Sequence, residues 1–302
     1  DKGREYHPSL EYEWDGVLQT CRMMLDAVRY DSVDISRYIP LIEGSLNFFD
    51  TYYRGMAARR GYSDLDGKGK LVLYPASAGA TYKMAYNPSS TIAALRSVLE
   101  AYGRKPDMLA RIPAIPMRTE DGKEMIFPAE VWERTGDTGI PQLLPVFPWR
   151  IYGVGREGLE TARNTYLYGR EVQQSRAQGR EKLDNVWAAC LGLTDQASGL
   201  TLERLSDGPY RFPAFRQTND AWTPDLNEGN SGMMGMQEML LQEVNGKLLI
   251  FPAWPREWDV HFKLHAPGKT TVEAEWKGGK LVNLTVIPKE REKDVVNCLG
   301  GK

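Results

Sequence analysis

The sequence has 302 residues, of which 42% are apolar and 26% are charged, so it can bury a sizeable core and is not a disordered or low-complexity protein. Its 38 basic and 40 acidic residues give a net charge of -2, which excludes strong non-specific attraction to nucleic acid. No apolar run approaches the roughly 18 residues of a membrane-spanning helix. These properties predict a soluble globular protein whose partners include neither nucleic acid nor a membrane.

Apolar residues at helical spacing predict that the first two-thirds of the chain are mainly helical. One helix should begin after Asn87-Pro88-Ser89-Ser90, whose polar side chains offer capping groups, and should end at Gly103. The other helices are expected, in chain order, at 17–28, 35–53, 158–168, 183–191, 195–205 and 232–244.

The last part of the chain changes to the period of β-strands. Apolar and polar residues alternate over 272–276 and again over 282–286, with the turn Gly278-Gly279 between them. This pattern predicts a β-hairpin, and 247–251 reads as a further strand.

The change of period predicts two domains, a helical domain over 1–245 and a small β-sandwich-like domain over 246–302. Long proline- and aromatic-rich connections lie at 104–150 and 207–231. Connections of that length are uncommon unless they build a functional surface, so the chemistry is expected there.

Cysteines and histidines give no sign of a metal site. Cys21, Cys190 and Cys298 are far apart, odd in number and lack C-x-x-C spacing, which argues against a disulfide framework and a cysteine-based zinc site. His261 and His265 are four residues apart, but they lie in an expected strand or loop without a third ligand nearby in sequence. We therefore expect neither a metal nor an organic cofactor.

Aromatic residues are frequent, with eight tryptophans and fifteen tyrosines. An aromatic face packs well against the apolar face of a sugar ring, but large rings also fill seams between helices and strands, and both interpretations remain open. Most of the tryptophans lie in expected connections: Trp132, Trp149, Trp222, Trp254 and Trp258.

The segment from Trp222 to Asn230 places two carboxylates and two amides before an expected helix. Inverting glycoside hydrolysis needs one carboxylic acid to protonate the leaving oxygen and one carboxylate to activate a water. Asp225 or Glu228 could be that base, with Asn227 or Asn230 orienting the water. The same residues are typical of an ordinary capped helix start, so this alternative also stays open.

Several stretches resemble the C-terminal part of bacterial glycoside hydrolases related to family 95, the inverting α-L-fucosidases and α-L-galactosidases, although the histidine-rich loop of family 95 is missing. They are Leu73–Ala78 with Tyr82, Asn87–Arg96, Pro145–Gly153, Arg211–Phe215, Ser231–Gln242, Lys247–Val260 and Phe262–Val272.

The resemblance implies a mainly helical fold, an (α/α)6 toroid present in part and followed by a small C-terminal antiparallel β domain. It implies an exo-acting, inverting hydrolase of plant or algal polysaccharide, periplasmic or secreted by a bacterium. It also implies that the N-terminal remainder of the same enzyme is missing and would be a partner, and the start at Asp1 without methionine is taken as a further sign of a fragment.

The relatives read Pro-Ala-x-Ala-x-Glu-Thr-Tyr where this chain reads Pro75-Ala-Ser-Ala-Gly-Ala80-Thr-Tyr82. Ala80 therefore occupies the position of the general acid, and losing that acid typically costs about 10²–10⁴-fold in rate. Because the neighbours are intact, we interpret Ala80 as a Glu→Ala replacement that traps substrate. The resemblance makes Asp225 or Glu228 the base and Tyr82, Asn87, Trp149, Trp222, Asn227 and Asn230 the substrate-binding residues.

Two other functions remain open. A natural Ala80 would favour a non-catalytic glycan-binding protein. A polysaccharide lyase, which needs a tyrosine or histidine base, could use Tyr82 or Tyr86, although no basic cluster surrounds them in the sequence.

Overall fold

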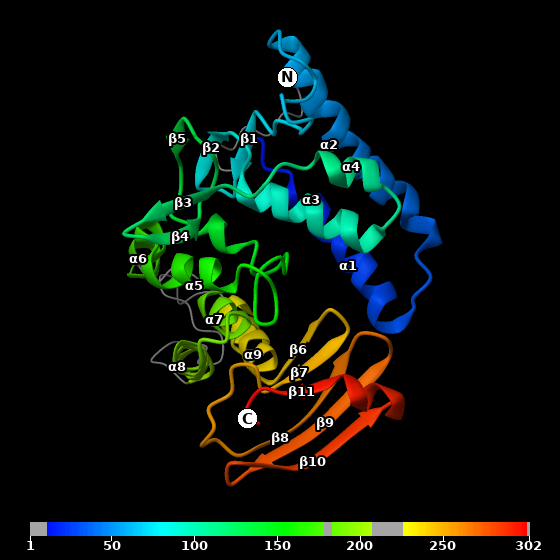
Figure 1. The fold of residues 1–302 in the computed structure, drawn as a ribbon, viewed down its shortest axis with the longest axis vertical. Helices are drawn as coiled ribbons and strands as arrows, with labels where there is room; N and C mark the ends of the chain where they lie inside the picture. The colour runs from blue at the N-terminus through cyan, green and yellow to red at the C-terminus, as the bar shows by residue number, and fades with distance from the viewer. Residues whose placement is uncertain (1–10, 178–182, 207–225, 301–302) are drawn as a thin grey trace. The chain divides into compact units, whose positions relative to one another are not determined.

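The computed structural model describes residues 11–177, 183–206 and 226–300. The chain forms two compact units, each with its own core (Figure 1). Unit 1 comprises Asp1–Arg29, Val33–Ile151 and Glu160–Gly179. Unit 2 comprises Tyr30–Ser32, Tyr152–Leu159 and Arg180–Lys302.

The helices of unit 1 bury one apolar face each, except α3, whose side chains are buried on nearly every side. Gly103 ends α3 in the left-handed region at φ 68°, as expected for a C-terminal glycine. The helices are α1 (Asp15–Asp31), α2 (Ile39–Arg59), α3 (Ser89–Tyr102), α4 (Pro106–Arg111), α5 (Leu159–Tyr168) and α6 (Arg170–Ala177), with 3-10 turns at Ser36–Tyr38 (η2) and Pro141–Leu143 (η3).

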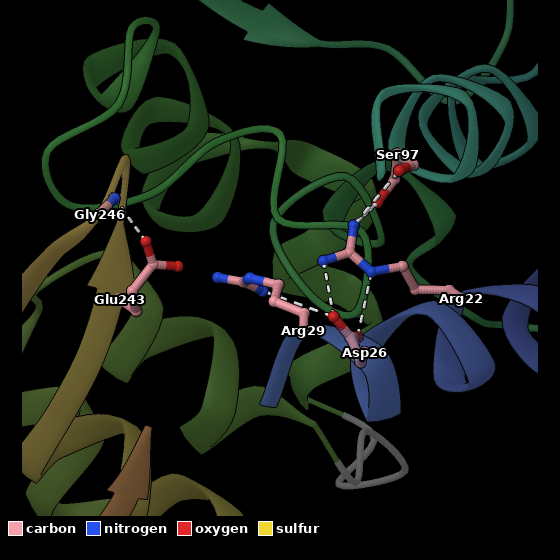
Figure 2. Close-up of polar contacts among 6 residues, drawn as sticks. All are labelled: Arg22, Asp26, Arg29, Ser97, Glu243 and Gly246. Carbon is pink, nitrogen blue, oxygen red and sulfur yellow. Dashed lines mark hydrogen bonds and ion pairs between the residues drawn. The ribbon is translucent and has the colours of Figure 1, made fainter. Parts of the chain in front are cut away.

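A polar contact ties α1 to the buried helix α3 (Figure 2). The guanidinium of Arg22 donates to both carboxylate oxygens of Asp26, one turn later on α1, at 3.0 Å each. It also donates to the hydroxyl of Ser97 on α3 at 2.7 Å and to the Ser97 carbonyl at 3.3 Å. Because Asp26 neutralises the arginine, the guanidinium can bind α3 without leaving an unpaired charge.

The strands of unit 1 are short. The antiparallel order β1–β2–β5 places β2 (Tyr82–Ala85) between β1 (Ala76–Ala78) and β5 (Arg134–Thr135). A separate hairpin pairs β3 (Met117–Glu120) with β4 (Lys123–Ile126). With two to four residues each, these strands are too short for alternation to reveal them, so the sequence did not predict them.

Unit 2 contains the helices α7 (Asp184–Cys190), α8 (Thr194–Leu205) and α9 (Leu226–Leu240), which contact one another. The buried amide of Asn185 on α7 donates to the Thr201 hydroxyl on α8 at 3.2 Å and to the Ser231 carbonyl on α9 at 2.8 Å. Gly235 leaves the space for this amide, because a Cβ there would lie 2.2 Å from the Asn185 nitrogen.

The remainder of unit 2 forms two three-stranded sheets. The predicted hairpin is confirmed as β9 (Thr270–Lys277) and β10 (Lys280–Ile287), which pair Lys277 with Lys280 around the glycine turn, and β8 (Val260–Ala266) extends this sheet. The predicted strand at 247–251 is confirmed as β7 (Lys247–Ile250). It lies between the antiparallel β6 (Leu241–Val244) and the parallel β11 (Val295–Asn297). A 3-10 segment, η5 (Lys289–Asp294), precedes β11.

The tight turn between β6 and β7 is closed by a side chain. The carboxylate of Glu243 accepts the amide hydrogen of Gly246 at 2.5 Å, as Figure 2 shows. The expected helix at 232–244 therefore ends at Leu240, and its last apolar residues belong to β6. A short apolar run fits both periods, and pairing with β7 decides in favour of a strand.

The expected (α/α)6 toroid is wrong for this structure. Helices account for 45% of it and strands for 20%, in several small sheets, and the described residues do not form a ring of paired helices. Helical periodicity identifies individual helices but not their arrangement, and the expected all-helical body contains β1–β5. Within the described residues, no helix has the length and apolar character needed to cross a bilayer.

Candidate functional site

The turn that carries Ala80 connects β1 and β2 in unit 1 and lies against the loop 136–139. The carbonyl of Thr81 accepts the amide hydrogen of Gly136 at 2.7 Å, and its hydroxyl accepts that of Gly139 at 2.8 Å. A Cβ at Gly136 would lie 3.0 Å from the Ala80 carbonyl oxygen. Glycines in the loop thus allow its backbone to lie directly against the Ala80 turn.

A pocket of about 280 Å³ opens beside this turn. Two aromatic rings and several polar side chains line it, and they come from β2, from the segment after β4 and from α6. Among the lining residues are Tyr82, Trp132, Thr135, Asp137, Glu171 and Gln174.

The two rings of the pocket contact each other. The centroids of Tyr82 and Trp132 are 4.5 Å apart at an interplanar angle of 51°, and Phe127 packs against Trp132 at 5.2 Å. Burial raises the pKa of Tyr82 to about 12, and the nearby Glu171 carboxylate adds to the rise. The Tyr82 hydroxyl is therefore neutral at ordinary pH and available as a hydrogen-bond donor.

Glu171 is held by a bidentate ion pair. Arg118 donates from Nη1 and Nη2 to the two carboxylate oxygens at 3.0 and 2.5 Å, and its guanidinium lies 4.5 Å from the centroid of Phe127. Partial burial is the largest single influence and raises the pKa of Glu171, but the hydrogen bonds and charge of Arg118, a backbone hydrogen bond and the charge of Arg170 together outweigh it and leave the pKa below its ordinary value. Glu171 is thus a carboxylate that can accept hydrogen bonds but holds no proton to donate.

Further charged groups lie close to the same hairpin. The buried Lys83 on β2 donates to the Gly79 carbonyl at 3.1 Å and pairs with Glu13 at 3.6 Å, while burial lowers the lysine's pKa. The Thr91 hydroxyl donates to Asp15 at 2.8 Å. Desolvation raises the pKa of Asp15 to about 6, although the hydrogen bonds it accepts act in the opposite direction.

Of the substrate-binding residues expected in unit 1, only Tyr82 lines this pocket. Both ends of the buried Asn87 amide are occupied by the protein: Oδ1 accepts the Leu73 amide hydrogen and Nδ2 donates to Glu130, each at 2.8 Å. The expected cap for α3 is wrong, because Pro88 is the N-cap and no side chain bonds there. Trp149 is 3% exposed, and its buried indole nitrogen has no partner among the described residues.

The other predicted residues belong to the segment before and within α9. Trp222 and Asp225 lie outside the described residues. Asn227 and Glu228 belong to the first turn of α9, and Asn230 is exposed on the same helix. The helix begins at Leu226, earlier than expected, so Asn227, Glu228 and Asn230 are helical residues and not part of a loop. The choice between Asp225 and Glu228 stays a prediction.

Most residues of the pocket were not among the predicted site residues, and Trp132, Asp137 and Glu171 are the most informative of them. Trp132 was identified as one of the tryptophans in a connection, but without a role. Asp137 lies in the polar segment Thr135-Gly-Asp-Thr-Gly139, whose glycines are a signal from which a tight loop could have been predicted. Glu171 lies on α6 and gave no sequence signal, because only folding places it beside Tyr82.

The two spaced histidines lie on β8 with separate partners. His261 contacts Glu273 at 3.0 Å, and His265 contacts Asp31 at 2.9 Å. Among residues 11–177, 183–206 and 226–300, no three histidine, cysteine or carboxylate side chains are arranged to hold a metal ion. No disulfide joins Cys21, Cys190 or Cys298 within the described residues.

Neither a known family model nor a curated protein matches this chain. The pocket and the residues around it are therefore the basis for inferring a function.

Proposed function

We propose that this chain binds carbohydrate in the Tyr82–Trp132 pocket and is an exo-acting, inverting glycoside hydrolase of plant or algal polysaccharide with alanine at its acid position. The observation that carries the proposal is the pair of contacting rings in a pocket whose other walls are hydroxyl, amide and carboxylate groups. The family resemblance at 73–96 supports the same conclusion from the sequence.

The polar groups of the pocket suit the hydroxyls of a sugar. The Trp132 ring offers an apolar face, and the neutral Tyr82 hydroxyl can donate a hydrogen bond. Glu171, kept ionised by Arg118, can accept hydrogen bonds, because each carboxylate oxygen has more than one acceptor position. A binding site that orients a sugar ring typically has an aromatic wall and a small number of charged groups held in fixed orientations.

Protonation of the leaving oxygen requires a group that carries a proton. Glu171 does not, because its pKa is lowered, and the methyl group of Ala80 cannot. Ala80 is partly exposed on the turn that contacts the pocket loop, so a longer side chain at this position has room to extend. We therefore expect the chain to bind a glycan without cleaving it efficiently.

A lyase is less consistent with the pocket. Its base would be a tyrosine that loses its proton easily, whereas burial and Glu171 raise the pKa of Tyr82 to about 12. The other tyrosine considered as a lyase base, Tyr86, is packed against the ring of Tyr74, with the two ring centroids 3.9 Å apart. A lyase would release an unsaturated product that absorbs in the ultraviolet, and we expect none.

Binding can be tested by titrating the chain with neutral oligosaccharides that carry terminal fucose or galactose. Trp132→Ala should weaken binding about tenfold, because it removes the stacking face. Tyr168→Ala is the matched control, since this ring is 53% exposed and does not line the pocket. Equal affinities for the wild type and Trp132→Ala would contradict the proposed binding site.

Catalysis can be tested with Ala80→Glu and its uncharged control Ala80→Gln. Release of fucose or galactose by the glutamate variant alone, with inverted configuration in the NMR spectrum of the first product, would support a hydrolase whose acid belongs at position 80. If neither variant cleaves any glycan while binding persists, the protein is a glycan-binding protein instead.

A further inference from the structure

A second and larger pocket, of about 380 Å³, lies in unit 1 where α2 ends. It is formed by the last residues of the helix, by the loop that follows and by the residue after β2. Its lining includes Arg60, Tyr62, Ser63, Asp66, Val72 and Tyr86, none of which lines the Tyr82–Trp132 pocket.

Arg60 is the cation of this pocket, and it lacks a counter-charge. Its Nη1 donates to the Tyr74 carbonyl at 2.7 Å, and its guanidinium lies 4.8 Å from the centroid of the Tyr74 ring. Its Nε is buried without a hydrogen-bond partner, and no carboxylate of the described residues forms an ion pair with it. A partly buried guanidinium with unfilled donor positions favours an anionic ligand.

The acids nearest in sequence are engaged elsewhere. Asp64 pairs with Arg54 on α2 at 2.5 Å. Oδ1 of Asp66 accepts the amide hydrogens of Lys68 and Lys70, each at 2.8 Å, which fixes the turn at the rim of the pocket. Asp64 is thus paired with Arg54 and Asp66 holds the turn, and neither carboxylate forms an ion pair with Arg60.

An aromatic wall stands beside Arg60, and contacts within the protein hold it in place. Tyr74 and Tyr86 are stacked with centroids 3.9 Å apart and 15° between their planes. The Tyr74 hydroxyl donates to Glu133 at 2.9 Å, and the backbone of Tyr86 pairs with Val131. Tyr62, 69% exposed, adds a second ring at the pocket. A fixed ring next to a cation matches a ligand that combines an apolar ring face with a negative charge.

We propose that this pocket binds an anionic sugar, with the carboxylate of a uronic acid or a sulfate ester on Arg60 and the sugar ring against Tyr86 and Tyr62. Ser63 and Asp66 supply hydrogen-bonding groups for the hydroxyls. This rests on the proposed function and names the class of polysaccharide, an acidic one, which the chain holds at two places. The planar guanidinium fits a carboxylate or a sulfate with two parallel hydrogen bonds.

The test is a calorimetric titration with trigalacturonate, with a galactose trisaccharide that carries one sulfate ester and with the neutral galactose trisaccharide. Arg60→Gln should weaken binding of the anionic trisaccharides about ten- to hundredfold, because it removes a charge-assisted pair of hydrogen bonds. Arg59→Gln removes the same charge from the adjacent, exposed residue and should leave both affinities within about twofold. Comparing the two anionic ligands distinguishes a carboxylate from a sulfate.

Two variants protect the test against a loss of folding in Arg60→Gln. Arg60→Lys keeps the charge but not the paired donors, so it should bind anionic sugars with intermediate affinity. Tyr62→Ala changes an exposed ring and should weaken binding without lowering the melting temperature. An equal loss of affinity for the neutral trisaccharide in Arg60→Gln, an equal loss in Arg59→Gln or no binding of either anionic trisaccharide would overturn the proposal.

The two pockets can be separated in the same experiment. Trp132→Ala should weaken neutral glycans that bind in the Tyr82–Trp132 pocket and leave the affinity for the anionic trisaccharides unchanged. Arg60→Gln should weaken binding of the anionic trisaccharides and leave the affinity for the neutral glycans unchanged. Failure of the Arg60 pocket alone would overturn the inference about acidic sugars, while failure of the Trp132 pocket alone would overturn the proposed function.

Discussion

The hydroxyl of Thr81 accepts the amide hydrogen of Gly139 at 2.8 Å, and a Cβ on Gly139 would lie 2.7 Å from the same oxygen. The contact joins the Ala80 turn to the loop that carries Asp137. Thr81 is 3% exposed, so its side chain has little room to move aside. The loop therefore keeps its place at the pocket only if residue 139 has no side chain.

Gly139→Ala should lower the free energy of unfolding by about 1–3 kcal/mol, since the new methyl group overpacks the contact with Thr81. It should also weaken neutral glycan binding, because the pocket loop has to shift. Gly55→Ala is the control: nothing lies within 4 Å of its Cβ in α2, so it should be neutral or stabilising. Urea denaturation measures the free energy of unfolding of both variants, and an unchanged stability in Gly139→Ala would contradict the proposed overpacking against Thr81.

Glu171→Gln should cost about 1–2 kcal/mol at neutral pH, because Arg118 then loses its bidentate ionised partner and keeps only the pair with Glu120 at 3.3 Å. The lowered pKa of Glu171 stabilises the folded state above the ordinary glutamate value of 4.5, and this stabilisation is lost as the pH falls through the folded-state pKa. Glu171→Gln has no carboxylate to protonate at this position, so it should not show this loss of stability as the pH falls. Glu160→Gln, which removes an exposed pair with Arg163, should change stability by less than about 0.5 kcal/mol.

Asp15→Asn should make the protein more stable at neutral pH, by at most about 3 kcal/mol. With a folded-state pKa of about 6, above the ordinary 3.8, the carboxyl group favours its protonated form, so stability falls as the pH rises between these values. Glu13 and Tyr53 are the titratable groups that interact with it, and Glu13 in turn pairs with Lys83.

The asparagine can still accept the hydrogen bond from Thr91, so this contact is not lost. Thermal unfolding over a pH series should show a slope in the wild type that is absent from Asp15→Asn. Glu100→Gln, an exposed carboxylate on α3, serves as the comparison and should keep the wild-type slope. An identical slope in all three proteins would argue against Asp15 as its source.

Asn87→Ala should destabilise the chain by about 2–4 kcal/mol, because it removes two buried hydrogen bonds and places alanine at a φ of 48°. Asn87→Gly tolerates that φ and isolates the hydrogen-bond contribution, so it should cost less. If Asn87 contacted substrate directly, its variants would lose glycan affinity at full stability, and we expect the opposite result.

The sequence by itself indicated the type and the approximate position of several elements. Apolar spacing predicted α1, α2 and α3, and the glycine pair at 278–279 predicted the β9–β10 turn in its register. These features depend on contacts within one helical face or between neighbouring strands, which a local pattern records. The intact residues around Ala80 also drew attention to the segment that carries Tyr82, although its strands were not predicted.

Only the tertiary structure decided which residues share a pocket. Trp132 and Glu171 meet Tyr82 although each lies far from it in the sequence, and Arg60 faces a tyrosine stack built from two separate segments. The tertiary structure contains helices and small sheets where a toroid was expected. The small sheets were missed because strands of two to four residues are too short to show a period in the sequence. Packing between distant segments brings such groups together, and the spacing of residues along the sequence does not show which segments will meet.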